Sequence, residues 1–226
     1  MTTSSFCARP VTVSVSGGDE KGKARLFYVY PDVLRSSSEY FRKLITVDGH
    51  KHEQRIEVNQ TYADTFGLYL HFLYFGKVPC RAHDNDPGKS TEYDELFHLY
   101  IFADSVKDVK VKNAVIGAIM SKSVEKSPAP LPDKEVITLA YDDLTYGSPL
   151  QRLVVDLYTW FADESCLDQG WDSMQSDFAL DLARALLKRN GATRKQRAIP
   201  AGVGICDYHD PGDCAECVNK KRRRAE

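Results

Sequence analysis

The residues whose types and spacing are best suited to chemistry lie between Cys206 and Cys217, near the end of the chain (CDYHDPGDCAEC). This segment holds three of the six cysteines and one of the six histidines. Cys206 and His209 are separated by two residues, Cys214 and Cys217 also by two, and four residues separate the pairs. Close pairs of thiolate and imidazole ligands can surround a tetrahedral ion. The sequence therefore predicts one structural zinc site, in which no position remains for a catalytic water.

A second interpretation of this segment stays open. The four-residue spacer is short and differs from the common zinc-finger spacings, so the same residues are also compatible with a disordered tail that binds no metal. Five basic residues follow directly, and they predict either a nuclear import signal or a contact with nucleic-acid phosphates: Lys220, Lys221, Arg222, Arg223 and Arg224. Import is favoured, because neither a helix-turn-helix pattern nor interleaved aromatic residues accompany these charges. Alternatively, these five residues form a solvated end of the chain that only aids solubility.

Composition limits the class of protein. The chain has 226 residues, of which 42% are hydrophobic, which is enough for a buried core in one large domain or two small ones. The net charge is −2, but residues 191–226 carry eight basic and five acidic side chains, whereas the remainder carries 22 and 27. An acidic body with a basic end suggests that the tail has a separate role.

Targeting and membrane signals are weak. The first ten residues show no apolar signal region, and the most hydrophobic run, residues 66–76, is too short to cross a bilayer. We therefore expect a soluble protein of the nucleus, the cytoplasm or both, with no membrane partner. In such a reducing compartment, metal ligation is the favoured use of cysteines 206–217 over disulfides.

The first half of the chain predicts a mixture of strands and helices. Residues 11–16 alternate strictly between apolar and polar side chains, and residues 26–30 supply a second strand of a hairpin. A helix with Tyr40 and Phe41 on one face follows, then a short strand at 55–58. Three further helices are expected before residue 122, one of which begins at a capping box of Thr61 and Asp64 and ends at Gly76.

The second half predicts helices alone. The proline-rich segment 127–133 marks a boundary, after which apolar residues recur at helical spacing around 136–140, 150–161 and 178–186. Apolar periodicity fails after residue 190, so we expect that the tail cannot fold without help. The expected organisation is a first domain at 10–122, an all-helical extension at 133–190 and a mostly disordered tail at 191–226 with the predicted zinc segment.

Several stretches in the first 120 residues resemble the BTB/POZ family: VTVSV (11–15), LFYVYPDVLRSSSEYFRKL (26–44), IEV (56–58), ADTFGLYLHFLYFGKV (63–78) and ELFHLYIFADSVKDVKVKNAVIGAIM (95–120). The stretch GSPLQRLVVDLY (147–158) and the C-x-Y-H segment at 206–209 resemble the fungal members. The resemblance implies an α+β fold, a small β-sheet flanked by helices, followed by the helical extension and the basic tail.

The resemblance also implies a function of contact. It implies a scaffold or adaptor for protein partners, in transcriptional regulation or ubiquitin-ligase assembly, and homo-oligomers are compatible with it. It leaves engagement of a cullin-type scaffold open. The surface residues that we expect to matter are Tyr30, Lys51, His52 and Tyr62. No cofactor is expected in the BTB unit.

An enzyme is not expected. The glycines at 17 and 18 lack the spacing of a phosphate-binding loop, and no paired nucleophile and base is evident from the sequence. The alternative function is a nuclear nucleic-acid-associated factor that acts through the Cys/His segment and the basic run. In that case nucleic acid would contact the tail only.

Overall fold

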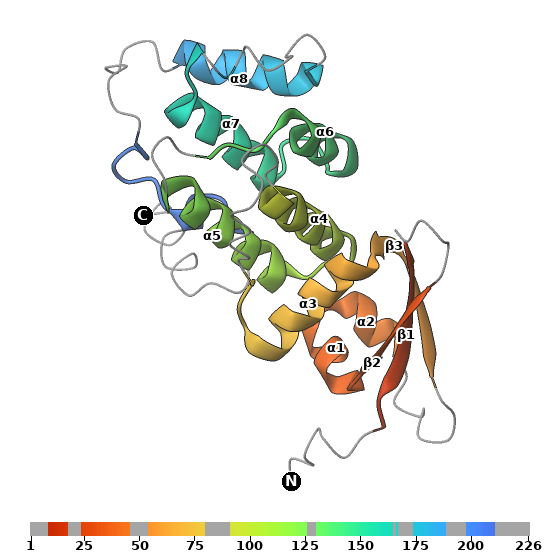
Figure 1. Ribbon diagram of the computed structural model, residues 1–226. Helices are drawn as coiled ribbons and strands as arrows, with labels where there is room; N and C mark the ends of the chain where they lie inside the picture. The colour runs from red at the N-terminus through yellow and green to blue at the C-terminus, as the bar shows by residue number, and fades with distance from the viewer. Residues whose placement is uncertain are drawn as a thin grey trace. The chain divides into compact units, whose positions relative to one another are not determined.

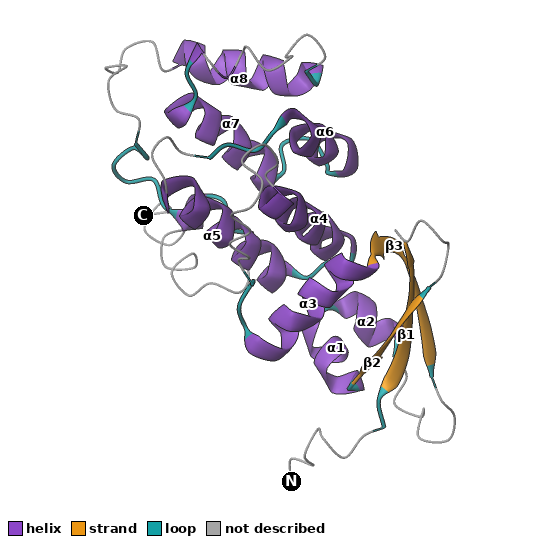
Figure 2. Cartoon of the chain, viewed as in Figure 1, coloured by secondary structure: helices purple, strands orange, loops and turns teal. Residues whose placement is uncertain are grey.

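The computed structural model describes most of the chain, in eight stretches: residues 9–17, 24–45, 54–79, 91–125, 130–164, 166, 174–188 and 198–210. The chain divides into two compact units. The first unit comprises Met1–Arg81 and His98–Ala114, and the second comprises Ala82–Phe97 and Val115–Glu226. Figures 1 and 2 show the strands and helices of both units.

The first unit contains a three-stranded mixed sheet. Its strands are β1 (Val11–Gly17), β2 (Arg25–Val29) and β3 (Arg55–Tyr62), in the order β2-β1-β3. β1 pairs antiparallel with β2 and parallel with β3. The predicted hairpin and the third strand are confirmed, and the sequence-adjacent pair is the antiparallel one, as a hairpin requires.

One face of this sheet forms the core of the first unit. Six residues that alternate onto this face are buried, namely Val11, Val13, Val15, Val29, Ile56 and Val58, and Phe27 on the same face is half-buried. Helices α1 (Pro31–Ser37), α2 (Glu39–Leu44) and α3 (Ala63–Phe75) lie on this side of the strands (Figure 2). The period-two burial makes the sheet amphipathic, because successive side chains of a strand point to opposite faces.

The helix ends of the first unit follow the sequence signals in part. Ser38 caps α2 by accepting a hydrogen bond from the Phe41 N–H at 3.3 Å, and Gly76 ends α3 in the left-handed region at φ 68°. The predicted capping box of Thr61 and Asp64 is wrong. β3 extends as far as Tyr62, which is the cap residue of α3 and makes no side-chain cap bond. Asp64 instead forms an ion pair with Arg25 at 2.6 Å.

Two longer helices contain residues that belong to both units. They are α4 (Thr91–Ser105) and α5 (Val109–Glu125), and each contributes residues to both units. Asp108 precedes α5, where its Oδ1 accepts hydrogen bonds from the backbone N–H groups of Lys110 and Val111 at 3.1 and 3.2 Å. A carboxylate in this position satisfies helix donors that have no partner in the first turn.

The remaining elements of the second unit are helical, as predicted. They are α6 (Lys134–Asp143), α7 (Pro149–Phe161) and α8 (Ser176–Lys188). Asp133 caps α6, and α7 begins with a complete capping box of Ser148 and Gln151 around Pro149. α7 packs against both α6 and α8 and buries most of its length. The predicted proline at its first turn is confirmed.

Residues 198–210 are the described part of the segment that was expected not to fold without help. They contain a short 3₁₀ turn at Ile205–Asp207, followed by Tyr208, which is buried. The Tyr208 hydroxyl donates to Asp156 Oδ2 of α7 at 2.6 Å. This contact with α7 attaches the segment to the second unit. A single anchoring tyrosine leaves no periodic pattern in the sequence, so the sequence could not predict it.

Among the helices that the structure describes, none combines the length and the apolar character that crossing a bilayer requires.

Candidate protein-interaction surface

β2 is apolar on both of its faces. Phe27 and Val29 point toward the core, where the Phe27 ring meets Phe66 edge to face at 5.0 Å. The alternate residues Leu26 and Tyr28 point to the opposite face, and they are 46% and 70% exposed. The four apolar residues that follow Arg25 thus give β2 a second apolar surface, which is suited to contact.

The rest of the outer face is polar. Tyr28 lies opposite Thr12 of β1, and Leu26 lies opposite Ser14. On the other side of β1, Thr12 is paired with Arg55 of β3 and Ser14 with Glu57. Leu26 and Tyr28 thus form an apolar strip along one side of a face that is otherwise lined by hydroxyl and charged groups.

This apolar strip lies on a strand at the edge of the sheet. In the described part of the sheet, β2 has β1 as its neighbour on one side and no strand on the other. An edge strand presents backbone N–H and C=O groups in a row, which a further strand can pair with. Exposed apolar side chains next to such a row add contact area to the backbone hydrogen bonds.

A second exposed aromatic group lies at the end of α3. Tyr74 and Phe75 are 43% and 69% exposed, and the Tyr74 hydroxyl accepts a hydrogen bond from the Tyr30 N–H at 3.4 Å. The His71 ring lies 4.6 Å from the Phe75 ring. Tyr30 itself is half-buried at the start of α1.

The four surface residues predicted from the sequence have different outcomes. Tyr30 adjoins the aromatic end of α3, and Tyr62 at the end of β3 is 49% exposed, with its ring edge to face against His98 at 5.0 Å. Lys51 and His52 lie outside the described residues. Leu26 and Tyr28 were missed, although the unbroken apolar run LFYVY, beside the alternating VTVSVS, carries the signal.

The first unit also contains a buried polar network that joins Tyr69, Asp108 and Ser37. The Tyr69 hydroxyl donates to Asp108 Oδ2 at 2.9 Å and lies 2.8 Å from Ser37 Oγ. Burial raises the pKa of Asp108, opposed by the hydrogen bonds from the Val111 amide and Tyr69, and burial with the nearby carboxylate raises the pKa of Tyr69. Tyr69 and Asp108 are 0% and 1% exposed, so the pair joins α3 to the start of α5 and is closed to a substrate.

The predicted metal site lies partly outside the described chain. Cys206 and His209 are both half-buried, on either side of the buried Tyr208, whereas Cys214 and Cys217 are not among the described residues. The basic run 220–224 is also outside them. Within the described stretches, no three His, Cys, Asp or Glu side chains gather as a metal site would require. The zinc site stays a prediction.

The comparison with protein families gives one match. Residues 11–111 match the model of the BTB/POZ domain, from the start of β1 into the first turn of α5. No curated protein matches the chain. BTB domains are generally non-catalytic modules of protein interaction and oligomerisation. Residues 11–111 of this chain are thus a BTB/POZ domain, built as a small three-stranded mixed sheet with helices.

Proposed function

We propose that this chain is an adaptor or scaffold that binds a protein partner along β2 of its BTB/POZ domain. The observation that carries the proposal is the exposure of Leu26 and Tyr28 on an edge strand whose alternate residues face the core. Tyr28 is 70% exposed and lies beside the exposed Leu26, so the two side chains form one apolar surface. Tyrosine is among the residue types that contribute most to protein interfaces.

The mode of binding that fits this strip is strand addition. A partner segment that pairs with the outer edge of β2 would form backbone hydrogen bonds, while alternate side chains contact Leu26 and Tyr28. The nearest charged groups on the same face are Arg55 and Glu57, which would select the charge of the partner. Tyr30, Tyr62, Lys51 and His52 are proposed as further contacts of the domain.

The two biological settings for this adaptor are transcriptional control and ubiquitin-ligase assembly, in the nucleus or the cytoplasm. The helices after the BTB/POZ domain would enlarge the surface that a partner contacts. Homo-oligomers are part of the same proposal, because a second copy can supply the added strand. The class of protein that binds β2 decides between the settings.

The test is affinity purification of the full chain, followed by mass spectrometry. Leu26→Thr with Tyr28→Thr removes the strip but keeps β-forming residues. Val124→Thr is the matched control, because Val124 is an exposed apolar residue of α5 in the second unit. We expect at least one partner to be recovered with the wild type and with the control but not with the double variant. The same partner should bind the wild type directly when both proteins are purified. Equal binding by all three proteins would refute the role of β2.

A second candidate function is a nuclear nucleic-acid-associated factor that acts through the tail. The observation that favours it is the hydrogen bond between Tyr208 and Asp156, which anchors the segment that holds Cys206 and His209. An anchored pair of ligands loses less conformational entropy when an ion binds than a pair in a free tail does. We propose that Cys214 and Cys217 complete a structural zinc site, and that residues 220–224 direct nuclear import or contact phosphates.

Three measurements test this second candidate. Cobalt added to the full chain should give thiolate-to-metal absorption bands that Cys206→Ala with His209→Ala removes, and their absence from the wild type would refute the metal site. Alanines at 220–224 should abolish nuclear enrichment. A chain ending at residue 210 keeps the Tyr208 anchor, so loss of salt-dependent DNA binding on this truncation, with partner binding intact, would separate the two functions.

A further inference from the structure

The direction of the backbone hydrogen bonds in β1 is fixed by its contact with the residue before β3. The Thr12 N–H donates to the Gln54 carbonyl at 3.0 Å, so the backbone groups of Thr12 point toward β3. The N–H and C=O of one strand residue point to the same side, and successive residues alternate between the two sides. The backbone groups of Val13 therefore point toward β2, where Val13 lies opposite Phe27.

The same alternation shows which backbone groups of β2 face outward. Val13 and Phe27 form the kind of antiparallel pair that exchanges hydrogen bonds, so the backbone groups of Phe27 point toward β1. Those of Leu26 and Tyr28 must then point away from β1, to the edge that has no strand in the described part of the sheet. The two residues with exposed apolar side chains thus also present two N–H and two C=O groups at this edge.

The Tyr74 hydroxyl limits this edge at one end. It accepts a hydrogen bond from the Tyr30 N–H at 3.4 Å, and Tyr30, which is still extended, lies two residues beyond Tyr28. The N–H of Tyr30 therefore has the same outward direction, and its bond to a side chain of α3 agrees with the alternation derived from Thr12. The part of the edge that a further strand can use runs from Leu26 to Tyr28.

The position of these backbone groups determines where the side chains of an added strand lie. In an antiparallel pair, the residues directly opposite Leu26 and Tyr28 would each exchange two hydrogen bonds with them. Directly opposite residues have their side chains on the same face of the sheet. Two residues of the added strand, separated by one residue, would therefore contact the exposed Leu26 and Tyr28 side chains. Apolar residues suit both positions, because they remove apolar surface from water.

The size of the edge favours a short segment over a folded partner. The five residues of β2 span about 17 Å, and an edge about 10 Å thick offers roughly 200 Å² of contact. A stable interface between folded proteins buries about 800 Å² on each partner. The outer face beside the strip is polar, with Thr12, Ser14, Arg55 and Glu57, so a second copy of the chain would find no further apolar area there.

We propose that the partner of β2 is a short extended segment of a different protein, which pairs antiparallel with Leu26 and Tyr28 and carries apolar residues at two positions separated by one residue. This inference rests on the proposed adaptor function, to which it adds the register, the direction and the chemical class of the ligand. The residue between the two apolar positions points to the other face of the sheet, so we expect its type to vary.

The register is tested by amide hydrogen exchange of the full chain, resolved to single residues by nuclear magnetic resonance. The amides of Leu26 and Tyr28 should exchange about tenfold faster or more than those of Phe27 and Val29, because only the latter two donate to β1. Equal protection of all four amides in the chain alone, at low concentration, would overturn the proposal. The Phe27 and Val29 amides also show whether β2 is folded.

The ligand class is tested with a library of random peptides of about seven residues, selected for binding to the full chain. The selected peptides should share two apolar residues separated by one residue, and they should slow exchange at Leu26 and Tyr28. N-methylation of either apolar residue should weaken binding about tenfold or more, because it removes an N–H that donates to β2. N-methylation of the intervening residue is the matched control and should have little effect. A selection without such peptides would overturn the proposal.

Failure of strand addition is distinguishable from failure of the adaptor function. If a partner is lost with Leu26→Thr and Tyr28→Thr, but the Leu26 and Tyr28 amides stay fast in its complex with the wild type, the strip binds without an added strand. Equal binding by the wild type and the double variant would refute both proposals. If the two amides become protected as the concentration of the chain alone rises, with a doubling of mass in sedimentation, the added strand comes from a second copy, and the proposal of a different protein is overturned.

Discussion

Each of the two units contains a tyrosine that donates a hydrogen bond to a carboxylate, which is buried in the first unit and half-buried in the second. In the first unit Tyr69 donates to Asp108 at 2.9 Å, and in the second Tyr208 donates to Asp156 at 2.6 Å. Burial raises the pKa of both carboxyl groups. The chemistry of the pairs is the same, but their surroundings differ.

The Asp108 pair is part of the packed interior. Tyr69 lies among aromatic rings, with Phe102 at 5.1 Å and Phe66 at 6.1 Å, and Asp108 also caps α5 through two backbone N–H groups. The Asp156 pair attaches a segment to a helix surface, and Tyr208 is the buried residue among 198–210. The same kind of hydrogen bond therefore supports the packed interior in the first unit and attaches a surface segment in the second. Loss of the first should spread through a unit, whereas loss of the second should stay local.

The largest expected effect is that of Asp108→Ala. The change leaves two helix-start amides without their acceptor and removes one of the two hydrogen-bond partners of the buried Tyr69 hydroxyl, so we expect a loss of about 2–4 kcal/mol in the free energy of unfolding. Urea unfolding measures the loss, and hydrogen exchange should show faster exchange of the β1 amides. Unchanged exchange in β1 would show that the network is not integral to the first unit.

Asp156→Ala should have a smaller and more local effect. Because Asp156 is half-buried and water can replace it, loss of its hydrogen bond should cost about 0.5–1.5 kcal/mol, so amides in residues 198–210 should exchange roughly 2 to 10 times faster. The β1 amides serve as the internal control and should be unaffected. Faster exchange throughout the second unit would mean that residues 198–210 belong to its core, and the contrast between the two pairs would fail.

The sequence predicted the first unit better than the attachments of the second. Strand alternation in VTVSVS and the helical spacing of apolar residues are local signals, and they predicted the three strands and helices α2 to α5 in order, but not α1 (Pro31–Ser37). The capping box at Thr61 failed because the sheet extends β3 past it, and local residue types do not report strand pairing. The strip of Leu26 and Tyr28 was readable in the run LFYVY, once both faces of the strand were considered.

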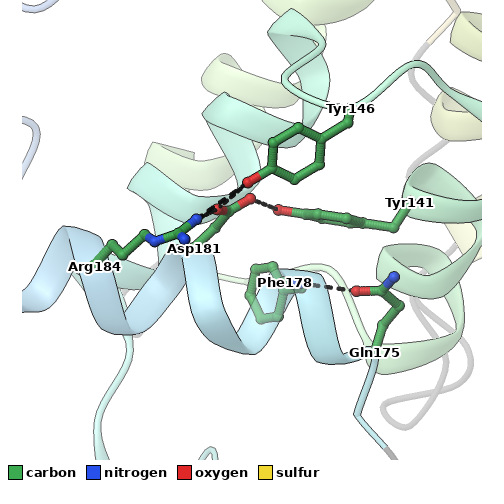
Figure 3. Close-up of polar contacts among 6 residues, drawn as sticks. All are labelled: Tyr141, Tyr146, Gln175, Phe178, Asp181 and Arg184. Carbon is green, nitrogen blue, oxygen red and sulfur yellow. Dashed lines mark hydrogen bonds and ion pairs between the residues drawn. The ribbon is translucent and has the colours of Figure 1, made fainter.

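The contacts of the tail and of α8 are long-range. Tyr208 and Asp156 are 52 residues apart, and Tyr141 and Asp181 (Figure 3) are 40 apart, so no periodic pattern connects them. The apolar spacing that predicted α8 was read as one buried face around Phe178. The residues 179, 180, 183, 186 and 187 form a second face, and only the exposure in the folded chain separates the two. The zinc ligands and the basic run stay predictions.

Removal of the tyrosine hydroxyl should cost more stability in the first unit than in the second. Tyr69→Phe should lower the free energy of unfolding by about 1–2 kcal/mol, because it strands part of a carboxylate that is 1% exposed. Tyr208→Phe should cost about 0.5–1 kcal/mol, because the Asp156 side chain is only half-buried and water can replace the hydroxyl. Urea denaturation of both variants gives the two values. A larger loss of unfolding free energy for Tyr208→Phe than for Tyr69→Phe would contradict the view that only the Tyr69 bond supports the interior of its unit.

The smallest effect is a pH dependence that Asp108 contributes. Its pKa in the folded chain is raised above the ordinary value of 3.8, so the folded state retains the proton after the unfolded state has lost it. Stability from this group therefore falls as the pH rises from about 4 toward neutral, by less than about 1.4 kcal/mol per pH unit. Asp108→Asn keeps a capping oxygen but cannot ionise, so the wild type should lose stability relative to this variant over that range. Parallel stability profiles of the two proteins between pH 4 and 7 would mean that the carboxyl group ionises as readily inside the BTB/POZ domain as in water.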